Sequence, residues 1–256
     1  MQNRIQIASP APILNTPDFV SVFGGLAIPT DDKGHPHNFE FVALPGMTCY
    51  ITEKCSQWIA RVTCPHYPGD NLFLDVRFTK TWEPLLPIFI PSKEEILKQM
   101  HSLLDTPYVW GGNWSKGIPQ LLEYYPPEGP LSPRMKILWT LSGIDCSGLL
   151  FQTTNGQTPR NTSQLIHFGT GLKINNLKIH ELEQIIEPLD MILYRGHVLY
   201  VLNATTTIES KSPYGVILRD LRERLEEIGQ GRVGKDEWDA TCFTDSQFII
   251  RRPFSV

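Results

Sequence analysis

The stretch LSGIDCSGLLFQ, residues 141–152, places Cys146 between an aspartate and a serine, with a glycine close on either side. The residues from the serine onward, SGLLFQTTNG, predict a short helix that ends at the Asn-Gly pair. A cysteine just before a helix lies near unpaired N–H groups and the positive end of the helix dipole, which stabilise a thiolate. Gly143 and Gly148 permit a tight turn and close approach by a substrate. Cys146 is therefore a candidate nucleophile, although a lone cysteine at such a place also fits a core position.

A cysteine nucleophile needs a base, and a third group that orients the base. His197, one of seven histidines, begins an apolar strand in YRGHVLYVL directly after a glycine. Glu209 follows twelve residues later in TTIESKS, beyond a turn-like NATT. An adjacent antiparallel strand would bring its carboxylate to the far nitrogen of His197. The spacing alone also allows a structural histidine and a solvated glutamate.

The composition is that of a soluble globular protein: 256 residues, 41% hydrophobic and 20% charged, enough for one large domain or two smaller ones. The net charge is −4 and no long basic cluster is present, which argues against nucleic acid as the partner. The amino-terminal stretch has no apolar run of signal-peptide length, and no segment approaches the ~20 apolar residues of a membrane helix. We therefore expect a cytoplasmic protein without a membrane partner.

The cysteines are odd in number and unevenly spaced, which disfavours a disulfide framework. They are Cys49, Cys55, Cys64, Cys146 and Cys242. Cys55, Cys64 and His66 suggest a metal site only loosely, because the paired C-x-x-C spacing is missing. We interpret them as core or surface residues, and expect no metal and no cofactor.

Residues 1–85 are predicted to be a small β-barrel. FEFVAL, TCYIT, QWIARVTC and NLFLDVRF are short runs of β-branched and aromatic residues separated by Pro, Gly, Asp and Asn. The following TWEPLLPIFIPS contains three prolines and predicts a strap between two domains.

The second half is predicted to be α+β. Ser92 is a candidate N-cap for the helix KEEILKQMHSLLD, whose apolar face contains Ile96, Met100, Leu103 and Leu104. Residues 113–142 contain five prolines and predict a long irregular segment. Two or three strands follow in residues 190–210, then a charged amphipathic helix, LRDLRERLEEIG, and a last strand, QFIIRRP.

An ordered set of motifs resembles the NlpC-type cysteine peptidases of bacterial cell-wall metabolism, which have a papain-like fold. The motifs are PYVWGG (107–112), IDCSGLL (144–150), TPRNTSQ (158–164), PLDMILYRGHVLYVL (188–202) and the strand that ends near Glu209. The resemblance covers most of residues 93–256. It implies that Cys146 is the nucleophile and His197 the base. Glu209 stands where the family commonly has histidine, and a carboxylate can also orient an imidazole.

The same resemblance implies roles for residues around the nucleophile. Tyr108 matches the YxWGG tyrosine, whose hydroxyl helps to stabilise the oxyanion together with the N–H of Cys146. Asp145 and Ser147 match residues that contact the amino end and the backbone of the substrate. Two further positions stay open: Trp110 is a wall of the cleft or part of the core, and Arg160 binds substrate or is structural. Thr162 completes the Pro-Arg-x-Ser/Thr motif with Arg160.

Between YVWGG and DCSG, about thirty residues replace the short link that is usual in relatives. This insertion, residues 113–142, either caps the site or pads the surface.

The front half resembles the bacterial SH3 module that often precedes such catalytic domains, in ALPGMTCYITEKCSQWIARV (43–62) and HYPGDNLFLDV (66–76). The resemblance implies an SH3-like domain over residues 1–85, a linker over 86–92 and a peptidase domain over 93–256. In relatives, a tyrosine and an acid of this module close one end of the cleft and select a free L-Ala amino terminus. Tyr67 is the candidate tyrosine. Glu40 is a weaker candidate acid, because the local spacing matches poorly.

The expected activity is a γ-D-glutamyl–diamino acid endopeptidase that acts on peptidoglycan-derived peptides. The Cys/His pair also fits an amidase or an acyltransferase on another substrate. A third interpretation is an inactive cell-wall-binding protein. The oligomeric state stays open.

Overall fold

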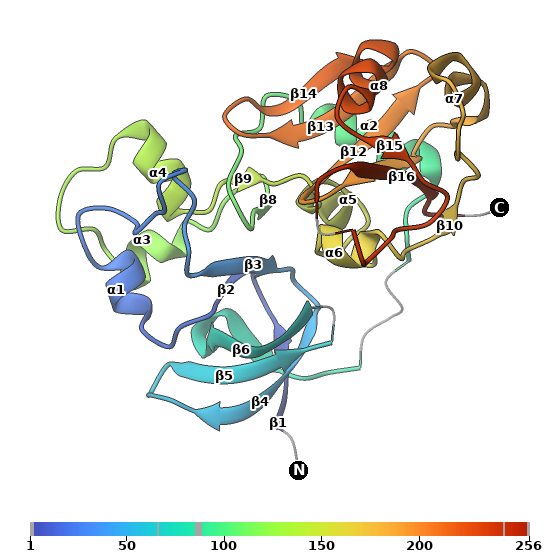
Figure 1. Cartoon of the computed structure of the whole chain (residues 1–256). Helices are drawn as coiled ribbons and strands as arrows, with labels where there is room; N and C mark the ends of the chain where they lie inside the picture. Colours follow the sequence, from blue (N-terminus) through green and yellow to red (C-terminus); the bar gives the residue numbers. More distant parts are fainter. Residues whose placement is uncertain (1–2, 66, 85–88, 243, 255–256) are drawn as a thin grey trace.

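Two large sheets form the framework of the protein, and they lie at opposite ends of the view in Figure 1. The structure is a computed structural model and describes residues 3–65, 67–84, 89–242 and 244–254. The N-terminal sheet comes from residues 3–81 and the C-terminal sheet from residues 170–252. The chain is therefore an α+β protein, as the sequence predicts.

The N-terminal sheet contains seven strands in the described residues, in the order β3-β2-β6-β5-β4-β1-β7, and each neighbouring pair is antiparallel. Its strands are β1 (Asn3–Ile7), β2 (Ala11–Leu14), β3 (Phe39–Ala43), β4 (Thr48–Lys54), β5 (Ile59–Cys64), β6 (Tyr67–Asp75) and β7 (Thr79–Thr81). A helix, α1 (Phe19–Phe23), and a 3-10 turn, η1 (Val76–Phe78), join them. The predicted strands are present as β3 to β6. Strands β1, β2 and β7, which span three to five residues, were not predicted.

The C-terminal sheet has the order β10-β16-β11-β12-β13-β14, with β15 paired in parallel to β16. Its strands are β10 (Thr170–Gly171), β11 (Met191–Tyr194), β12 (His197–Asn203), β13 (Thr206–Lys211), β14 (Gly215–Asp220), β15 (Val233–Gly234) and β16 (Gln247–Arg252). Residues 218–220 were predicted to begin the charged helix, but they belong to β14. The helix begins at Leu221, directly after β14, because Asp220 is its N-cap and accepts a hydrogen bond from the N–H of Glu223.

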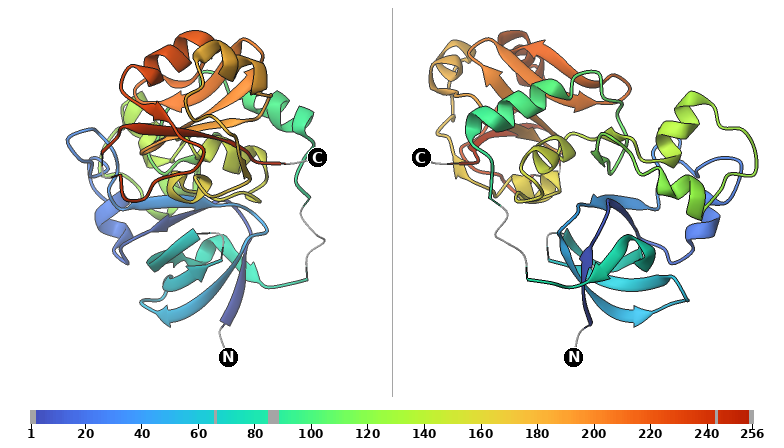
Figure 2. Two further views of the ribbon diagram at one scale, coloured as in Figure 1. Left: turned by 45° about the vertical axis from the view of Figure 1, so that its right-hand side comes forward. Right: turned by 180° about the vertical axis from the view of Figure 1, so that it is seen from behind.

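Helices cover both faces of the C-terminal sheet. They are α2 (Lys93–Ser102), α5 (Gly148–Thr153), α6 (Thr162–Leu165), α7 (Ile179–Ile185) and α8 (Leu221–Gly229). Side chains of β11 alternate: Met191 and Leu193 share a core with α2 and α5, whereas Ile192 shares one with α7 and α8. Figure 2 shows α2 from behind, across the strands. The predicted start of α2 is confirmed, since Ser92 and Glu95 form a capping box.

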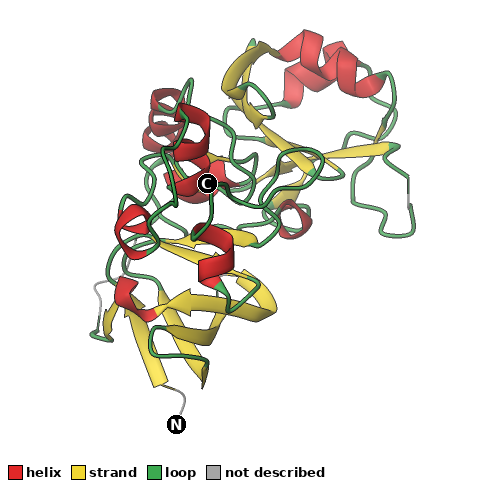
Figure 3. Cartoon of the chain, turned by 90° about the vertical axis from the view of Figure 1, so that its left-hand side faces the viewer, coloured by secondary structure: helices red, strands yellow, loops and turns green. Residues whose placement is uncertain are grey.

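The insertion is more regular than its prolines predict. It contains β8 (Asn113–Trp114), α3 (Gln120–Tyr124) and α4 (Pro133–Trp139), and β9 (Gly143–Ile144) pairs with β8 directly after it. Prediction fails here because each helix is at most seven residues long and forms by packing: the rings of Tyr125 and Trp139 contact Phe23 of α1. Figure 3 shows these short helices above the N-terminal sheet.

A single apolar core joins the insertion to the N-terminal sheet. Phe19, Phe41 and Phe73 belong to the same buried cluster as Trp139 and Phe151. The division into domains 1–85 and 93–256 stays a prediction, as does the SH3-like character of the first. Residues 86–88 of the proposed linker lie outside the described residues, as does residue 85 before it. Within the described part of the chain, no helix is long and apolar enough to cross a membrane.

A buried polar cluster fixes the insertion in register on the sheet. Asp75, at the end of β6, accepts hydrogen bonds from the Tyr125 hydroxyl at 2.6 Å and from the Arg77 guanidinium at 3.0 Å. The Asp75 side chain is fully buried, so its charge depends on these two donors.

We expect Tyr125→Phe to lower the free energy of unfolding by about 1–3 kcal/mol, because it leaves buried Asp75 with one donor fewer. Urea unfolding measures this change. Tyr124→Phe is the matched control, since the Tyr124 hydroxyl makes no hydrogen bond within the described residues and its loss should change little. Equal unfolding midpoints for the two variants would contradict a stabilising role for the buried bond.

Candidate active site

Cys146 lies in the short connection between β9 and α5, two residues before the first residue of the helix. Hydroxyl groups of the C-terminal sheet hold this connection from one side. Ser210 of β13 donates to the carbonyl of Ile144 at 2.6 Å, and Tyr200 of β12 donates to the carbonyl of Cys146 at 3.1 Å. The position of the thiol is therefore set by the sheet as well as by the helix that follows.

His197 is the first residue of β12 and follows a tight turn in which Gly196 has a φ of 74°. The register between β12 and β13 pairs Tyr200 with Ile208, which places Glu209 opposite Leu199, on the face that His197 also uses. His197 Nε2 lies 2.6 Å from Glu209 Oε2. The structure thus brings together the imidazole and the carboxylate that the spacing suggested.

The charges of His197, Glu209 and their neighbours stabilise one another. Burial lowers the pKa of His197, but the Cys146 thiolate and the Glu209 carboxylate outweigh it and raise the pKa to about 9. Burial raises the pKa of Glu209, but the hydrogen bonds from His197 and Arg224 outweigh it and lower the pKa to about 2. Glu209 occupies Nε2, so Nδ1 is the ring nitrogen left free for Cys146. The raised pKa keeps the His197 ring protonated at neutral pH.

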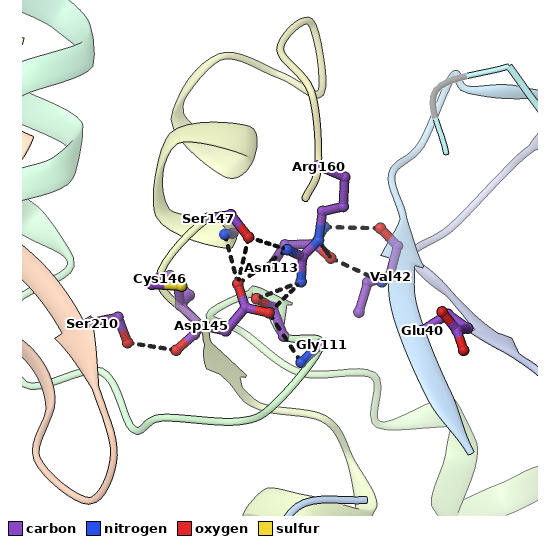
Figure 4. A network of polar contacts seen from close by, with 12 residues as sticks. Glu40, Val42, Gly111, Asn113, Asp145, Cys146, Ser147, Arg160 and Ser210 are labelled. Carbon is purple, nitrogen blue, oxygen red and sulfur yellow. Dashed lines mark hydrogen bonds and ion pairs between the residues drawn. The ribbon is translucent and has the colours of Figure 1, made fainter. Parts of the chain in front are cut away.

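On the other side of Cys146, Asp145 forms a buried ion pair with Arg160, whose side chain is 1% exposed (Figure 4). The two guanidinium NH groups lie 3.0 and 2.7 Å from the two carboxylate oxygens. Asp145 also accepts hydrogen bonds from the N–H groups of Gly111 and Gly148, and Ser147 lies between Asp145 and Arg160. Of the two interpretations of Arg160, the structure supports the structural one.

Asn113 connects this network to the N-terminal sheet, a role that the sequence did not indicate. Its amide oxygen accepts from Arg160 Nε at 3.1 Å and from the N–H of Val42 at 2.9 Å. Its amide nitrogen donates to the carbonyl of Val42 at 2.8 Å. Asn113 thereby pairs with β3 as a neighbouring strand would, and fixes that strand beside the nucleophile segment.

A cavity of about 370 Å³ opens over Cys146, within the size range of small-ligand sites. Among the residues that line it are Glu40, Tyr67, Tyr108, Trp110, Asp145, Cys146, Ser147 and Thr162. Thr162 Oγ1 lies 3.8 Å from the Cys146 sulfur. Burial raises the pKa of Tyr108, as do the charges of Asp145 and Cys146, so its hydroxyl stays a neutral donor. Trp110 is 47% exposed, which makes it a wall of the cleft, not a core residue.

One end of this cavity is formed by the N-terminal sheet. The Tyr67 hydroxyl donates to Glu40 Oε2 at 2.5 Å, and Asn15 donates to Glu40 Oε1 at 2.9 Å. Burial and the Glu40 carboxylate raise the pKa of Tyr67 to about 12, which keeps it a donor. Glu40 was the weaker candidate from the sequence because its contact with Tyr67 is not local. The two residues lie on β3 and β6, which are not adjacent in the sheet, and only the three-dimensional fold brings them together.

The insertion borders a neighbouring cavity. Arg134, Ile137 and Leu138 of α4 line a second cavity, of about 270 Å³, that shares Tyr108 and Trp110 with the cavity over Cys146. Of the residues considered for a metal, His66 lies outside the described residues, and no group of three metal-ligating side chains gathers within them.

Several solved structures are similar to this chain at low sequence identity and low TM-score. An NlpC/P60 family protein from Bacillus cereus is 14% identical with a TM-score of 0.39, over 98% of this chain and 63% of its own. NlpC2 from Trichomonas vaginalis is 13% identical with a TM-score of 0.38, over 100% of this chain and 74% of its own. The peptidoglycan hydrolase RipB from Mycobacterium tuberculosis is 17% identical with a TM-score of 0.38, over 64% of this chain and 65% of its own.

This chain thus spans less than two thirds of the length of the Bacillus cereus protein. No protein-family model matches the sequence, and no curated protein matches it either. Similarity at these identities and TM-scores says nothing about the activity of this chain. A proposal for its activity has to come from the geometry of the site.

We expect the imidazole of His197 to titrate near pH 9, and Cys146→Ser to lower its pKa, because serine brings no negative charge to the ring. The imidazole resonances of selectively labelled histidine, followed by NMR against pH, measure this. Cys242→Ser is the control, since Cys242 lies outside the cavity and its thiol contacts Thr244 and Ser246 among the described residues. A wild-type pKa near the usual 6.5 would exclude the thiolate–imidazolium pair.

Proposed function

We propose that the protein is a cysteine peptidase that hydrolyses the γ-D-glutamyl–diamino acid bond of peptidoglycan fragments with a free L-Ala amino terminus. The observation that carries the proposal is the cavity itself, which exposes Cys146, backed by His197 and Glu209, and carries a carboxylate, Glu40, at one end. This geometry suits an extended peptide whose amine is bound at one end and whose carbonyl meets the thiolate.

In the first step, the Cys146 thiolate attacks the carbonyl carbon of the scissile amide, and the carbonyl oxygen becomes an oxyanion. The N–H of Cys146 and the hydroxyl of Tyr108 are the donors available to it. The His197 imidazolium then gives its proton to the leaving nitrogen, the C–N bond breaks, and an acyl-enzyme forms. Water attacks this thioester with His197 as the base, and the Cys146 thiolate leaves.

The free amine is selected by charge. Two carboxylates line the cavity in the described residues, and they differ in what already neutralises them. Asp145 is paired with Arg160, whereas the donors to Glu40 within the described residues are neutral: Tyr67 and Asn15. An ammonium group therefore gains more from Glu40 than from Asp145. A contact between the substrate amine and Asp145 stays a prediction, since both oxygens of Asp145 already accept hydrogen bonds.

We expect the purified protein to convert an L-Ala-γ-D-Glu-diamino acid tripeptide into the L-Ala-γ-D-Glu dipeptide and the free diamino acid. Mass spectrometry of the products identifies the bond. Cys146→Ala should abolish turnover, and His197→Ala should lower kcat by about 10²–10⁴-fold, because proton transfer to the leaving amine is lost. His101→Ala is the control, since His101 is exposed on α2, outside the cavity. Release of ammonia or transfer of the acyl group to another amine would instead indicate an amidase or an acyltransferase.

Glu40→Gln should weaken the use of the free-amine peptide, because the amide keeps the shape but removes the charge. A charged hydrogen bond contributes about 1.5–3 kcal/mol, so kcat/KM should fall by roughly 10- to 150-fold. The same peptide acetylated at its amine should be a poor substrate for both proteins, at similar rates. Glu53→Gln serves as the control, because Glu53 is exposed and paired with Arg61. An equal fall in kcat/KM on both peptides would show that Glu40 does not bind the amine.

A further inference from the structure

Glu209 has a second partner that the proposed mechanism does not use. Arg224, on α8, donates from Nε to Glu209 Oε1 at 2.8 Å and from a terminal nitrogen to Oε2 at 3.1 Å. The side chain of Glu209 is fully buried and that of Arg224 is 2% exposed. Both carboxylate oxygens are therefore held by one guanidinium, while Oε2 also meets His197 Nε2.

Further contacts hold the Arg224 side chain in one orientation. Its terminal nitrogens also reach the hydroxyl of Tyr194 at 2.8 Å and Glu227 Oε2 at 3.2 Å. The ring of Tyr194 lies 5.2 Å from the ring of His197. Arg224 is thus in direct contact with the group that orients the imidazole, and in contact with a side chain packed against it.

The charges explain why such a residue is needed. A thiolate at Cys146 and an imidazolium at His197 sum to zero. An ionised Glu209 behind them would leave one negative charge uncompensated in a buried group, and burying an unpaired charge is costly. Arg224 brings the sum of the four groups back to zero, and a neutral residue at position 209 would not need it.

We propose that Arg224 is a positioning residue of this site, which fixes the Glu209 carboxylate toward His197 and neutralises its charge, so that a buried glutamate can orient the base. The proposal rests on the proposed cysteine chemistry of Cys146 and His197, but on no particular substrate. It predicts that neutral side chains at positions 209 and 224 shift the pKa of His197 in opposite directions, so that the two shifts cancel when both residues are replaced.

The test is a cycle of Glu209→Gln, Arg224→Met and the double variant, read by NMR titration of the His197 imidazole. Glu209→Gln removes the negative charge beside the imidazole ring and leaves the positive charge of Arg224, so the pKa of His197 should fall by about one unit. Arg224→Met leaves the carboxylate uncompensated, so the pKa should rise. The double variant should lie near the wild type. The other charged or titratable groups that face this set are Cys146, Tyr194, Glu227 and Arg232, and all are unchanged.

A purely structural Arg224 would give another pattern. Its loss would lower the unfolding temperature but leave the pKa of His197 in place, or shift it in the same direction as Glu209→Gln does. Either result overturns the proposal. Arg222→Met is the matched control, because Arg222 lies on the same helix, is exposed and pairs with Glu183. It should leave the titration unchanged.

If Arg224→Met does not fold, Arg224→Lys keeps the charge but cannot hold both oxygens at once. The pKa of His197 should then stay near the wild type, while alkylation of Cys146 by iodoacetamide at neutral pH slows about threefold or more, because the carboxylate no longer holds the ring. An unchanged alkylation rate overturns the proposal. Neither the titration nor the alkylation uses a peptide. If the tripeptide were not cleaved, the proposed function would be wrong, but the role of Arg224 would still be tested by these two measurements.

Discussion

The ion pair between Asp145 and Arg160 is the interaction on which the site depends. Asp145 precedes the nucleophile, and its carboxylate also accepts from the N–H groups of Gly111 and Gly148, so one side chain ties together three segments of the chain. Removal of one partner of such a buried pair costs about 3–5 kcal/mol, because the other charge is left uncompensated. The geometry around Cys146 therefore cannot relax locally without disturbing the fold.

The same network joins the two halves of the molecule. Arg160 holds the amide of Asn113, and that amide pairs with the backbone of Val42 in β3, the strand that also carries Glu40. The distance between Glu40 and the thiol is thus set by a short chain of hydrogen bonds. The shared core, which includes Phe41 of β3 and Phe151 of α5, supports that chain with apolar packing. A cavity formed by both halves follows from this arrangement.

The parts of the site that the sequence predicts are those that lie in continuous motifs. The helix after Cys146 and the strand that begins at His197 could be read locally, and the twelve-residue separation from Glu209 suits two strands joined by a turn. Arg224 could not be found in this way: it is one of two arginines on a charged amphipathic helix, and only the packing of α8 on the sheet shows which one faces inward. The helices of the insertion were missed for a related reason, since their stability comes from aromatic contacts with α1.

Two buried pairs of opposite charge flank Cys146 and His197, Asp145 with Arg160 on one side and Glu209 with Arg224 on the other. Each pair is neutral overall, so neither imposes a net charge on the cavity. Of the two carboxylates that line the cavity in the described residues, Glu40 is the one without a cationic partner. In the proposed function, a peptide with a free ammonium group would supply that partner, whereas a blocked amine would displace water from Glu40 and leave its charge unmatched. Selection of short, free-amine fragments over uncleaved polymer would then follow from the cost of that unmatched charge, with no need for a steric barrier.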